Sequence, residues 1–521
     1  MSLSVANHAA AEKLNGKMKI GIALVAIGFI SLITGLFNQF YHPTLLIIFF
    51  ITVSVGSLLY TKGLYQNTSA GVKNNGIMFK SLTNRGLWAW VLGIVLTSFY
   101  IILYWYPQYL GLNEKGNTGL VRFFDPLSYL LNGKQASQWF VYGTFYTLAI
   151  LLMGIKFMYK NRHSKYQVFR TGSIMFFQTA FAFLIPEFLE KLNPSKQYFS
   201  KDIKNMWPLN SYFTDQWNID GMLNGGNLGA FMLVMGVAMI FIISPILTYF
   251  YGKRWYCSWV CGCGGLAETA GDPFRQLSSK TTNAWKIERW MIHLVLVLVT
   301  VITIAVLFTM FYDNPSKYWL NKTSFSYMVI TFFAIFAAII LIKRKTVFKD
   351  FDRKAYFIAL AVMVFTIACL TNILMSNGRN VLFMEAGTLR QWYGFFIGSI
   401  FSGVIGVGFY PLMGTRVWCR FGCPMAAILG LQQKLFSRFR ITTNGSQCIS
   451  CGNCSTYCEM GIDVRAYAQK GQDIVRSSCV GCGVCSTVCP RGVLKLENGP
   501  QKTRKLNGPV QYVNGVFEVT E

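Results

Sequence analysis

Acidic residues are scarce in this chain, and histidines are scarcer still. Its 521 residues include 21 Asp and Glu against 48 Lys and Arg, and only 4 His. Charged residues make up 13% of the total, whereas a soluble protein would contain roughly a quarter. The low fraction excludes a chain that faces water along its whole length. Apolar runs close to the ~20 residues of a membrane span recur along it, so we expect an all-α polytopic membrane bundle.

The apolar runs predict about ten transmembrane helices. They lie near residues 20–37, 44–60, 87–105, 139–155, 171–188, 228–251, 290–311, 325–342, 355–375 and 391–411. No small-residue cleavage site follows the first run, so we interpret it as a retained anchor rather than a signal peptide. Lys and Arg are concentrated in the segments on the N-terminal side of the membrane, which is the positive-inside pattern. We therefore expect both termini in the cytoplasm.

Several familiar motifs are absent. No Walker motif and no Rossmann fingerprint occurs, which disfavours direct use of ATP or NADH. Among the four histidines only His293 lies clearly inside a predicted span, so a haem with paired histidine ligands is not expected. The formal net charge is +27, but no nucleic-acid recognition motif accompanies it. Because membrane topology explains much of this charge, we expect the lipid bilayer and no nucleic acid as a partner.

Cysteine, in contrast, is abundant near the C-terminal end. Ten of the 14 cysteines fall between Cys419 and Cys489, and eight of them form two C-x2-C-x2-C-x3-C runs. This is the bacterial ferredoxin spacing, in which the fourth cysteine of each run crosses to the other cluster. We expect two [4Fe–4S] clusters in a cytoplasmic α+β domain. The first would be held by Cys448, Cys451, Cys454 and Cys489, and the second by Cys479, Cys482, Cys485 and Cys458.

Zinc and disulfides are the alternatives for these cysteines. Paired C-x2-C units also bind zinc, whereas a reducing cytoplasm argues against disulfides. Glycines such as Gly452, Gly481 and Gly483 allow tight turns whose N–H groups point at cluster sulfurs. One departure stands out: Glu459 follows Cys458, where Pro490 follows Cys489. Beyond the runs, residues 493–496 predict a short strand, and residues 510–519 predict a hairpin around Asn514-Gly515.

A second cysteine motif occurs twice. Both copies have the pattern G-x-R-x-aromatic-C-x3-C, with cysteines at Cys257, Cys261, Cys419 and Cys423. Each copy follows a predicted span, the sixth and the tenth, so we expect two parallel four-helix repeats after an N-terminal pair of helices. Because residues at i and i+4 share a helical face, each copy could present two thiolates together. Cys263 lies close to the first pair and is a further candidate ligand.

Three interpretations of the repeated motif remain open. The cysteines could ligate an additional metal centre, such as an iron–sulfur cluster or Cu(I). They could form a thiol–disulfide redox pair, or they could simply pack, as free cysteine often does. Arg254 and Arg416 could face an anionic group or serve as positive-inside anchors. Cys369, alone inside the ninth span, is interpreted as a core residue.

These patterns divide the chain into six regions. They are the N-terminal helix pair with its loop (1–86), the first repeat (87–265), the second repeat (266–424), a linker (425–445), the ferredoxin domain (446–500) and a C-terminal tail (501–521). The linker begins as a basic amphipathic helix over 425–441, which we expect on the membrane surface. Gly403, Gly406 and Gly408 in the tenth span suit close helix packing.

At the cysteine motifs the chain resembles the membrane-bound polyferredoxins. These include the quinol-dehydrogenase membrane subunit of periplasmic nitrate reductase systems, the nitrous oxide reductase regulator and the accessory protein of cbb-type oxidases. The resemblance rests on Cys419-Arg-Phe-Gly-Cys423-Pro424, its partner copy and the two ferredoxin runs, and it covers roughly residues 228–500. In the first copy the family's C-x3-C-P element lacks its proline, because Gly262 and then Cys263 follow Cys261.

The resemblance implies a multi-pass protein of the bacterial inner membrane. It implies electron transfer between a quinone pool or cytoplasmic donor and a redox partner protein, within a respiratory or maturation complex. Three functions follow as hypotheses: electron transfer of the quinol-dehydrogenase kind, maturation of a metalloenzyme by reducing a metal such as copper, and redox-driven transport. Scarce ionisable residues inside the spans weaken the third. Glu187, near Gln178, could take protons from a bound quinol or be an ordinary interfacial carboxylate.

Overall fold

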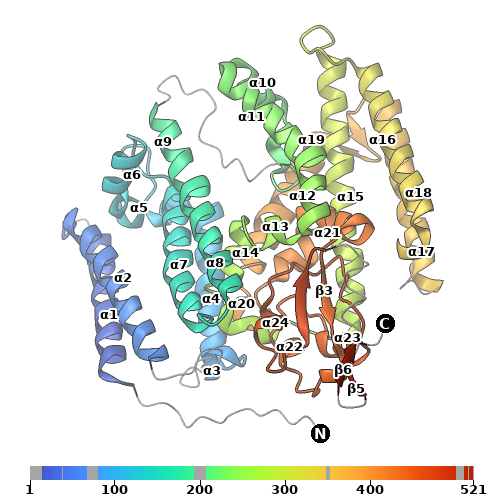
Figure 1. The fold of residues 1–521 in the computed structure, drawn as a ribbon. Coiled ribbons are helices and arrows are strands. Elements are labelled where there is room, and N and C mark those ends of the chain that lie inside the picture. Colours follow the sequence, from blue (N-terminus) through green and yellow to red (C-terminus); the bar gives the residue numbers. More distant parts are fainter. Residues whose placement is uncertain are drawn as a thin grey trace.

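The protein is described here by a computed structural model. It describes residues 14–37, 39–66, 80–192, 207–347, 353–499, 510–513 and 516–519. Most of these residues are helical, and the long helices run side by side, while the smaller domain that contains the two ferredoxin runs lies at the lower right in Figure 1.

Within the described residues, nine helices are long and apolar enough to cross a membrane. They are α1 (Gly16–Leu36), α2 (Thr44–Tyr65), α4 (Leu87–Trp105), α7 (Gln138–Lys160), the continuous α8–η3–α9 (Lys165–Leu192), the continuous α11–η5–α12 (Gly226–Tyr251), α15 (Thr282–Asp313), α16 (Lys322–Ile342) and α18 (Arg353–Met375). They correspond to the first nine predicted spans. The chain is therefore a membrane protein.

The tenth predicted span is built differently. Residues 391–411 lie in α19 (Ala386–Tyr393), the π-helix η7 (Gly394–Ile405) and the start of α20 (Tyr410–Met413). The segment packs closely on α4. A Cβ on Gly403 would lie 3.0 Å from the rings of Tyr100 and Tyr104, and one on Gly408 would lie 2.5 Å from Thr97. The glycine-based packing is thus present at Gly403 and Gly408, whereas Gly406 contacts only its own turn.

The N-terminal pair of helices lies at one edge of the bundle, on the left in Figure 1. Gly21 of α1 and Gly56 of α2 face each other, since a Cβ on either would lie 2.7 Å from the other's carbonyl oxygen. Close backbone approach through small residues is a common way for membrane helices to associate.

Shorter elements connect the long helices. They are α3 (Lys80–Thr83), η2 (Pro107–Leu110), α5 (Gly119–Phe123), α6 (Asp125–Leu131), η4 (Ser211–Thr214), α10 (Gln216–Asn224), α13 (Arg254–Cys257), α14 (Gly262–Glu268), η6 (Asp272–Leu277), α17 (Arg344–Val347), β1 (Asn380–Val381), β2 (Met384–Glu385) and η8 (Trp418–Gly422).

The ferredoxin domain is closed by two strands from its ends. The strand β3 (Arg440–Thr443) pairs antiparallel with β4 (Leu494–Glu497), with Ile441 opposite Leu496. Between them lie η9 (Gly445–Gln447), α22 (Asn453–Thr456), α23 (Val464–Gln469) and α24 (Val484–Thr487). The predicted strand at 493–496 is β4, shifted by one residue. Because β3 belongs to the same sheet, the domain starts inside the predicted linker and not at residue 446.

The helical part of the predicted linker is α21 (Pro424–Phe436), and its surroundings differ from the prediction. The helix ends five residues early, and seven of its thirteen residues are buried. It packs against α12 and α15, and a Cβ on Gly430 would lie 2.6 Å from the carbonyl oxygen of Ser477. The prediction of a helix resting on the membrane surface is therefore wrong, because α21 is enclosed between membrane helices and the ferredoxin domain.

The predicted C-terminal hairpin is present as β5 (Val510–Val513) paired antiparallel with β6 (Val516–Val519). Its turn residues Asn514-Gly515 lie outside the described residues.

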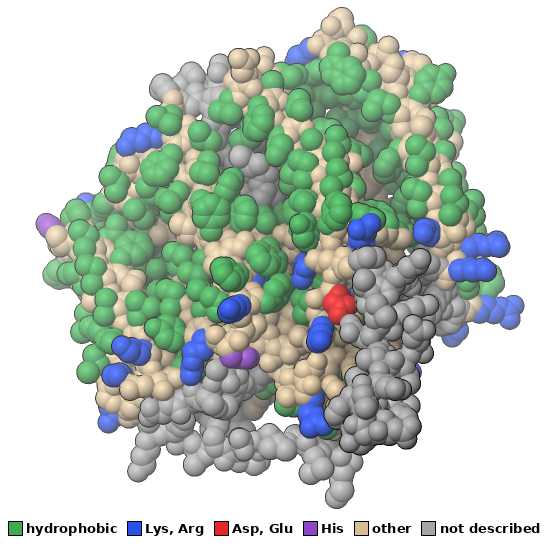
Figure 2. Space-filling view, in the orientation of Figure 1, with side chains coloured by type: hydrophobic (Ala, Val, Ile, Leu, Met, Phe, Trp, Pro, Cys, Tyr) green, Lys and Arg blue, Asp and Glu red, His purple; other side chains and the backbone are tan. Residues whose placement is uncertain are grey.

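Hydrophobic side chains cover the helical part of the surface, and most of the Lys and Arg visible in this view lie along the edge nearest the ferredoxin domain (Figure 2). This distribution is typical of a protein embedded in lipid.

Candidate functional site

The first set of predicted cluster ligands lines one cavity. Cys448, Cys451, Cys454 and Cys489 border the same hollow at the end of the ferredoxin domain. Burial raises the pKa of the Cys454 thiol to about 11, and nearby Cys489, Cys451 and Cys448 contribute to that shift. The fold thus places the last cysteine of the second run beside the first three cysteines of the first run.

The second set is also brought together. Burial raises the pKa of Cys485 well above its usual range, and the next contributions come from Cys482, Cys479 and Cys458. Cys454 of the first set contributes to the same shift, so the two sets adjoin each other.

Left-handed glycines shape the backbone around both sets. Gly452 (φ 77°) precedes α22, and Gly483 (φ 74°) precedes α24. These φ values favour glycine because a Cβ would clash with the backbone. The backbone N–H of Ile462 donates to the Cys458 Sγ at 3.4 Å. Backbone N–H groups directed at sulfur are expected where thiolates hold an iron–sulfur cluster.

The spacing of the sulfurs bears on the zinc alternative. In a tetrahedral zinc site with Zn–S of about 2.3 Å, the sulfurs lie about 3.8 Å apart. Among the described residues, no three cysteines have all their sulfurs within 4.8 Å of one another. The sulfurs thus lie farther apart than those of a closed tetrahedral zinc site.

The two copies of the C-x3-C motif have matching backbones. Each is preceded by a π-helix, a short helix with proline in its first turn, and a glycine with positive φ, Gly252 (68°) and Gly414 (93°). In each copy the second cysteine occupies the N-cap position of the next helix, Cys261 for α14 and Cys423 for α21, and the Cys423 thiol also accepts a hydrogen bond from the Ala426 N–H. The backbone N–H of Cys261 donates to the carbonyl oxygen of Tyr256 at 2.8 Å, and that of Cys423 donates to the carbonyl oxygen of Trp418 at 2.9 Å.

This arrangement corrects the expectation of one helical face. The two cysteines of each copy do not share a helix, because the chain changes direction between them. They nevertheless converge with Cys263 into what we call the five-cysteine group, Cys257, Cys261, Cys263, Cys419 and Cys423. Burial raises the pKa of Cys257 to about 12, and Cys261 and Cys419 add to the shift. A hydrogen bond with Cys261 and burial raise the pKa of Cys263.

One apolar core joins this group to the ferredoxin domain. Cys257, Cys419 and Cys423 belong to the same buried cluster of residues as Cys454, Cys479 and Cys485. The tertiary structure therefore places all thirteen cysteines other than Cys369 in one region, and Cys369 is buried in a different core.

A network of buried charges also crosses this junction. The Arg416 guanidinium contacts Glu268 at 2.5 Å and Glu459 at 3.0 Å, and its Nη1 lies 3.6 Å from the Cys419 Sγ. Arg275 contacts the other oxygen of Glu459 at 3.2 Å, and Arg170 of α8 pairs with Glu268. All five side chains are at most 1% exposed. Burial would raise the pKa of Glu459, but Arg416, Arg275 and Arg170 outweigh it and lower that pKa.

Sequence reasoning missed the role of Glu459. Its carboxylate oxygen, one from Glu268 and the Cys482 Sγ all lie within 4.8 Å of one another. The sequence carried one signal for it: Glu459 follows the last cysteine of the first run, whereas Pro490 follows the last cysteine of the second run. A buried acid requires a cationic partner, because an unpaired buried charge is costly.

The candidate carboxylate Glu187 lies apart from this region. Glu187 accepts a hydrogen bond from Asn132 Nδ2 at 2.6 Å, at the end of its span where the link to α10 begins. Arg254, in contrast, borders the ferredoxin domain, where it contacts the rings of Phe439 and Tyr166, at 4.7 and 5.7 Å from the ring centroids.

Comparisons with known proteins agree with this geometry. A family model described as a 4Fe-4S dicluster domain matches residues 440–490. A second model, described as a 4Fe-4S binding domain, matches twice, over residues 233–281 and 393–442. Each of these two matches covers one copy of the C-x3-C motif.

The chain is also similar to the putative electron transport protein YccM of Escherichia coli (strain K12). The two are 24% identical over 231 residues, which are 44% of this chain and 48% of that protein. The chain thus spans about half the length of this curated relative. No solved structure matches the chain. Together the matches and the helices support a membrane-type 4Fe–4S family, and we conclude that the chain is an iron–sulfur membrane protein.

Proposed function

We propose that this protein transfers single electrons at the membrane, between [4Fe–4S] clusters and a quinone or a redox partner protein. The observation that carries the proposal is the cavity bordered by Cys448, Cys451, Cys454 and Cys489. These four residues would hold the first cluster, and Cys479, Cys482, Cys485 and Cys458 the second. Such clusters supply one-electron couples whose potentials depend on hydrogen bonds and nearby charge. The printed name of the relative YccM supports electron transport.

We place the quinone in an aromatic pocket between α8, α12 and the ferredoxin domain. This pocket has a volume of about 1000 Å³. Tyr166, Trp255 and Trp259 line its wall, Phe177 and Leu247 come from the membrane helices, and Gly483 comes from the second cysteine run. Ring-rich apolar cavities with a few polar groups suit quinone head groups. Gly483 lies between Cys482 and Cys485, so a quinone here would adjoin the second cluster.

Trp259 is the residue on which to test this pocket. Its indole N–H donates to the Tyr166 hydroxyl at 3.3 Å, and the two ring centroids are 5.8 Å apart. We expect Trp259→Leu to raise the quinol concentration needed to reduce the clusters several-fold. Trp319→Leu is the control, since Trp319 is 93% exposed and lies in the loop between α15 and α16, outside the pocket. Equal behaviour of the two variants would reject the pocket as the quinone site.

We further propose that the five-cysteine group holds an additional iron–sulfur centre. The two matches to a 4Fe-4S binding domain support this interpretation over thiol–disulfide chemistry or simple packing. The absence of any three cysteines with sulfurs within 4.8 Å, among the described residues, disfavours a single three-thiolate Cu(I) ion.

Iron and sulfide counting with electron paramagnetic resonance on anaerobically purified protein tests both assignments. Two clusters require about eight iron atoms per chain, and a third [4Fe–4S] centre about twelve. We expect a Cys482→Ser variant to lose the signal of one ferredoxin cluster. Stoichiometric zinc without iron would refute the proposal.

The orientation in the membrane is a separate part of the proposal. We infer that the protein lies in the bacterial inner membrane with both termini and the ferredoxin domain in the cytoplasm. The basic edge next to the ferredoxin domain supports this, because Lys and Arg are retained on the cytoplasmic side. Reporter fusions at the C-terminus, one active only in the cytoplasm and one only outside it, would decide the orientation.

A further inference from the structure

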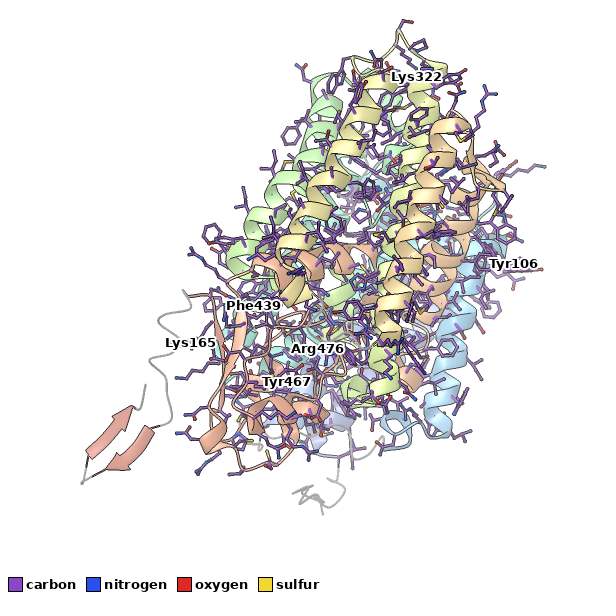
Figure 3. All side chains as sticks on the ribbon, turned by 90° about the vertical axis from the view of Figure 1, so that its right-hand side faces the viewer. Tyr106, Lys165, Lys322, Phe439, Tyr467 and Arg476 are labelled. Atoms are coloured by element: carbon purple, nitrogen blue, oxygen red, sulfur yellow. The ribbon has the colours of Figure 1, made fainter. Side chains whose placement is uncertain are left out.

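A second large pocket lies on another side of the ferredoxin domain. It has a volume of about 490 Å³ and is enclosed by the first turns of α15, by α21 and by the ferredoxin segments around residues 460–478. Two of its lining residues, Tyr467 and Arg476, are labelled in Figure 3 at the ferredoxin end of the bundle, opposite Lys322 at the start of α16. We call it the basic pocket.

The charge of its lining is strongly unbalanced. Among the described residues, six cationic side chains border it, Lys253, Arg289, Arg420, Lys434, Lys470 and Arg476, and a single acidic one, Glu288. The Arg420 Nε already donates to the Glu288 carboxylate at 2.5 Å. Among the described residues, the lining therefore holds more cationic than acidic side chains. Concentrated positive charge in a concave site attracts anions.

The remaining lining is apolar and aromatic. Trp285 lies beneath two of the cations, with the guanidinium carbons of Arg289 and Arg476 at 4.9 and 5.3 Å from its ring centroid. Ile292, Met460 and Tyr467 complete the apolar surface. A small inorganic anion would leave this surface unused, so the shape favours an anion attached to an apolar or aromatic body.

We propose that the basic pocket binds a phosphate-bearing anion of this kind. Arg and Lys are the side chains that bind phosphate, Arg through paired N–H groups and Lys as a point charge. Two sources share this chemistry. One is an anionic phospholipid, since basic pockets between membrane helices bind anionic head groups. The other is a soluble phosphorylated compound that enters from the side of the ferredoxin domain.

The position of the site gives it a role in the redox protein. Cys419 of the five-cysteine group borders the basic pocket, and Ser477 and Ser478 lead directly into Cys479. A bound phosphate would therefore place negative charge beside both groups of cysteines. The site is distinct from the aromatic pocket, with which it shares no lining residue.

The test compares a double variant with a matched control. Lys434→Gln with Lys470→Gln removes two charges from the basic pocket, where both side chains are at least partly exposed. Lys165→Gln with Lys495→Gln removes two exposed charges on the same side of the protein, outside the basic pocket. Lys470→Glu is a second variant, which reverses one exposed charge and does not touch the core.

Two probes distinguish the sources. Retention of phosphatidylglycerol against phosphatidylcholine is measured by native mass spectrometry of protein from mixed nanodiscs, and binding of inorganic pyrophosphate by calorimetry. We expect the wild type and the control to bind at least one probe, and the double variant and Lys470→Glu to bind it roughly tenfold more weakly. Selective phosphatidylglycerol retention identifies a lipid, and pyrophosphate binding a soluble ligand. Binding of neither probe, or equal binding by all variants, would overturn the proposal.

Discussion

The two copies of the C-x3-C motif share a backbone path but have different surroundings. Gly252 and Gly414 both adopt positive φ, and Cys261 and Cys423 both occupy the N-cap position of the following helix. The arginines at the same motif position, however, diverge. Arg254 is partly exposed and lies over aromatic rings, whereas Arg416 is 1% exposed and contacts two buried carboxylates.

The difference follows from the single ferredoxin domain. A duplicated sequence generates two equivalent sites, but one asymmetric domain can present Glu459 to only one of them. Arg416 receives that carboxylate, while Arg254 packs against Phe439 at the start of the same domain. The internal symmetry of the membrane bundle is thus broken by the ferredoxin domain that packs against it. Four sets of variants test this broken symmetry, from the largest expected effect to the smallest.

The largest effect is expected from the cysteines themselves. If both copies ligate one shared centre, Cys257→Ser and Cys419→Ser should each remove the whole centre, and the double variant should lose no further iron. Strong non-additivity is the signature of residues that act as a unit. Iron content and electron paramagnetic resonance spectra of the three proteins measure this. Independent, additive losses would show that the copies serve separate sites.

The arginines should separate the copies. Arg416→Gln leaves Glu459 and Glu268 short of a buried partner and should destabilise the protein by roughly 3–5 kcal/mol. Arg254→Gln removes a cation–π contact worth about 1 kcal/mol. Thermal unfolding in detergent of the two variants, purified in parallel, gives the comparison. Similar losses for both arginines would contradict the asymmetry.

The carboxylate that breaks the symmetry should also influence the neighbouring cluster. Glu459→Gln removes a negative charge close to Cys482, which should raise the reduction potential of one ferredoxin cluster by roughly 50–100 mV. Glu497→Gln, on the strand β4 of the same domain, is the control. Redox titration followed by electron paramagnetic resonance reports both potentials. A shift of the same size in the control would mean that the effect is not local.

The smallest effect is expected where the copies are alike. Gly252→Ala and Gly414→Ala each force a Cβ into a position with positive φ and extended ψ, which costs about 1–3 kcal/mol. The Cβ would also meet Phe439 at 2.7 Å in the first copy and Ser278 at 2.5 Å in the second. Unfolding midpoints should therefore fall by similar amounts. A large difference between the two would show that the backbone equivalence does not extend to the energetics.

Much of the architecture was readable from the sequence. In the part of the chain that the structure describes, nine apolar runs are helices long enough to span a membrane, because backbone groups in lipid must be paired within the segment. The strand at 493–496 and the hairpin at 510–519 were also recognisable, from alternating apolar residues and the Asn-Gly turn signal. The burial of α21 between the membrane helices and the ferredoxin domain could not be predicted, because amphipathic patterning shows that one face of a helix is apolar but does not show what covers that face.

Local spacing determined the chemistry of this protein, and tertiary contacts determined how its parts are joined. The intervals between cysteines specify which thiols can surround a cluster, since covalent geometry limits how far neighbouring side chains reach. The pairing of Arg416 with Glu459, 43 residues apart in the chain, depends on how the ferredoxin domain docks beneath the helices. That docking results from long-range packing and charge burial, for which the sequence carries no short-range pattern.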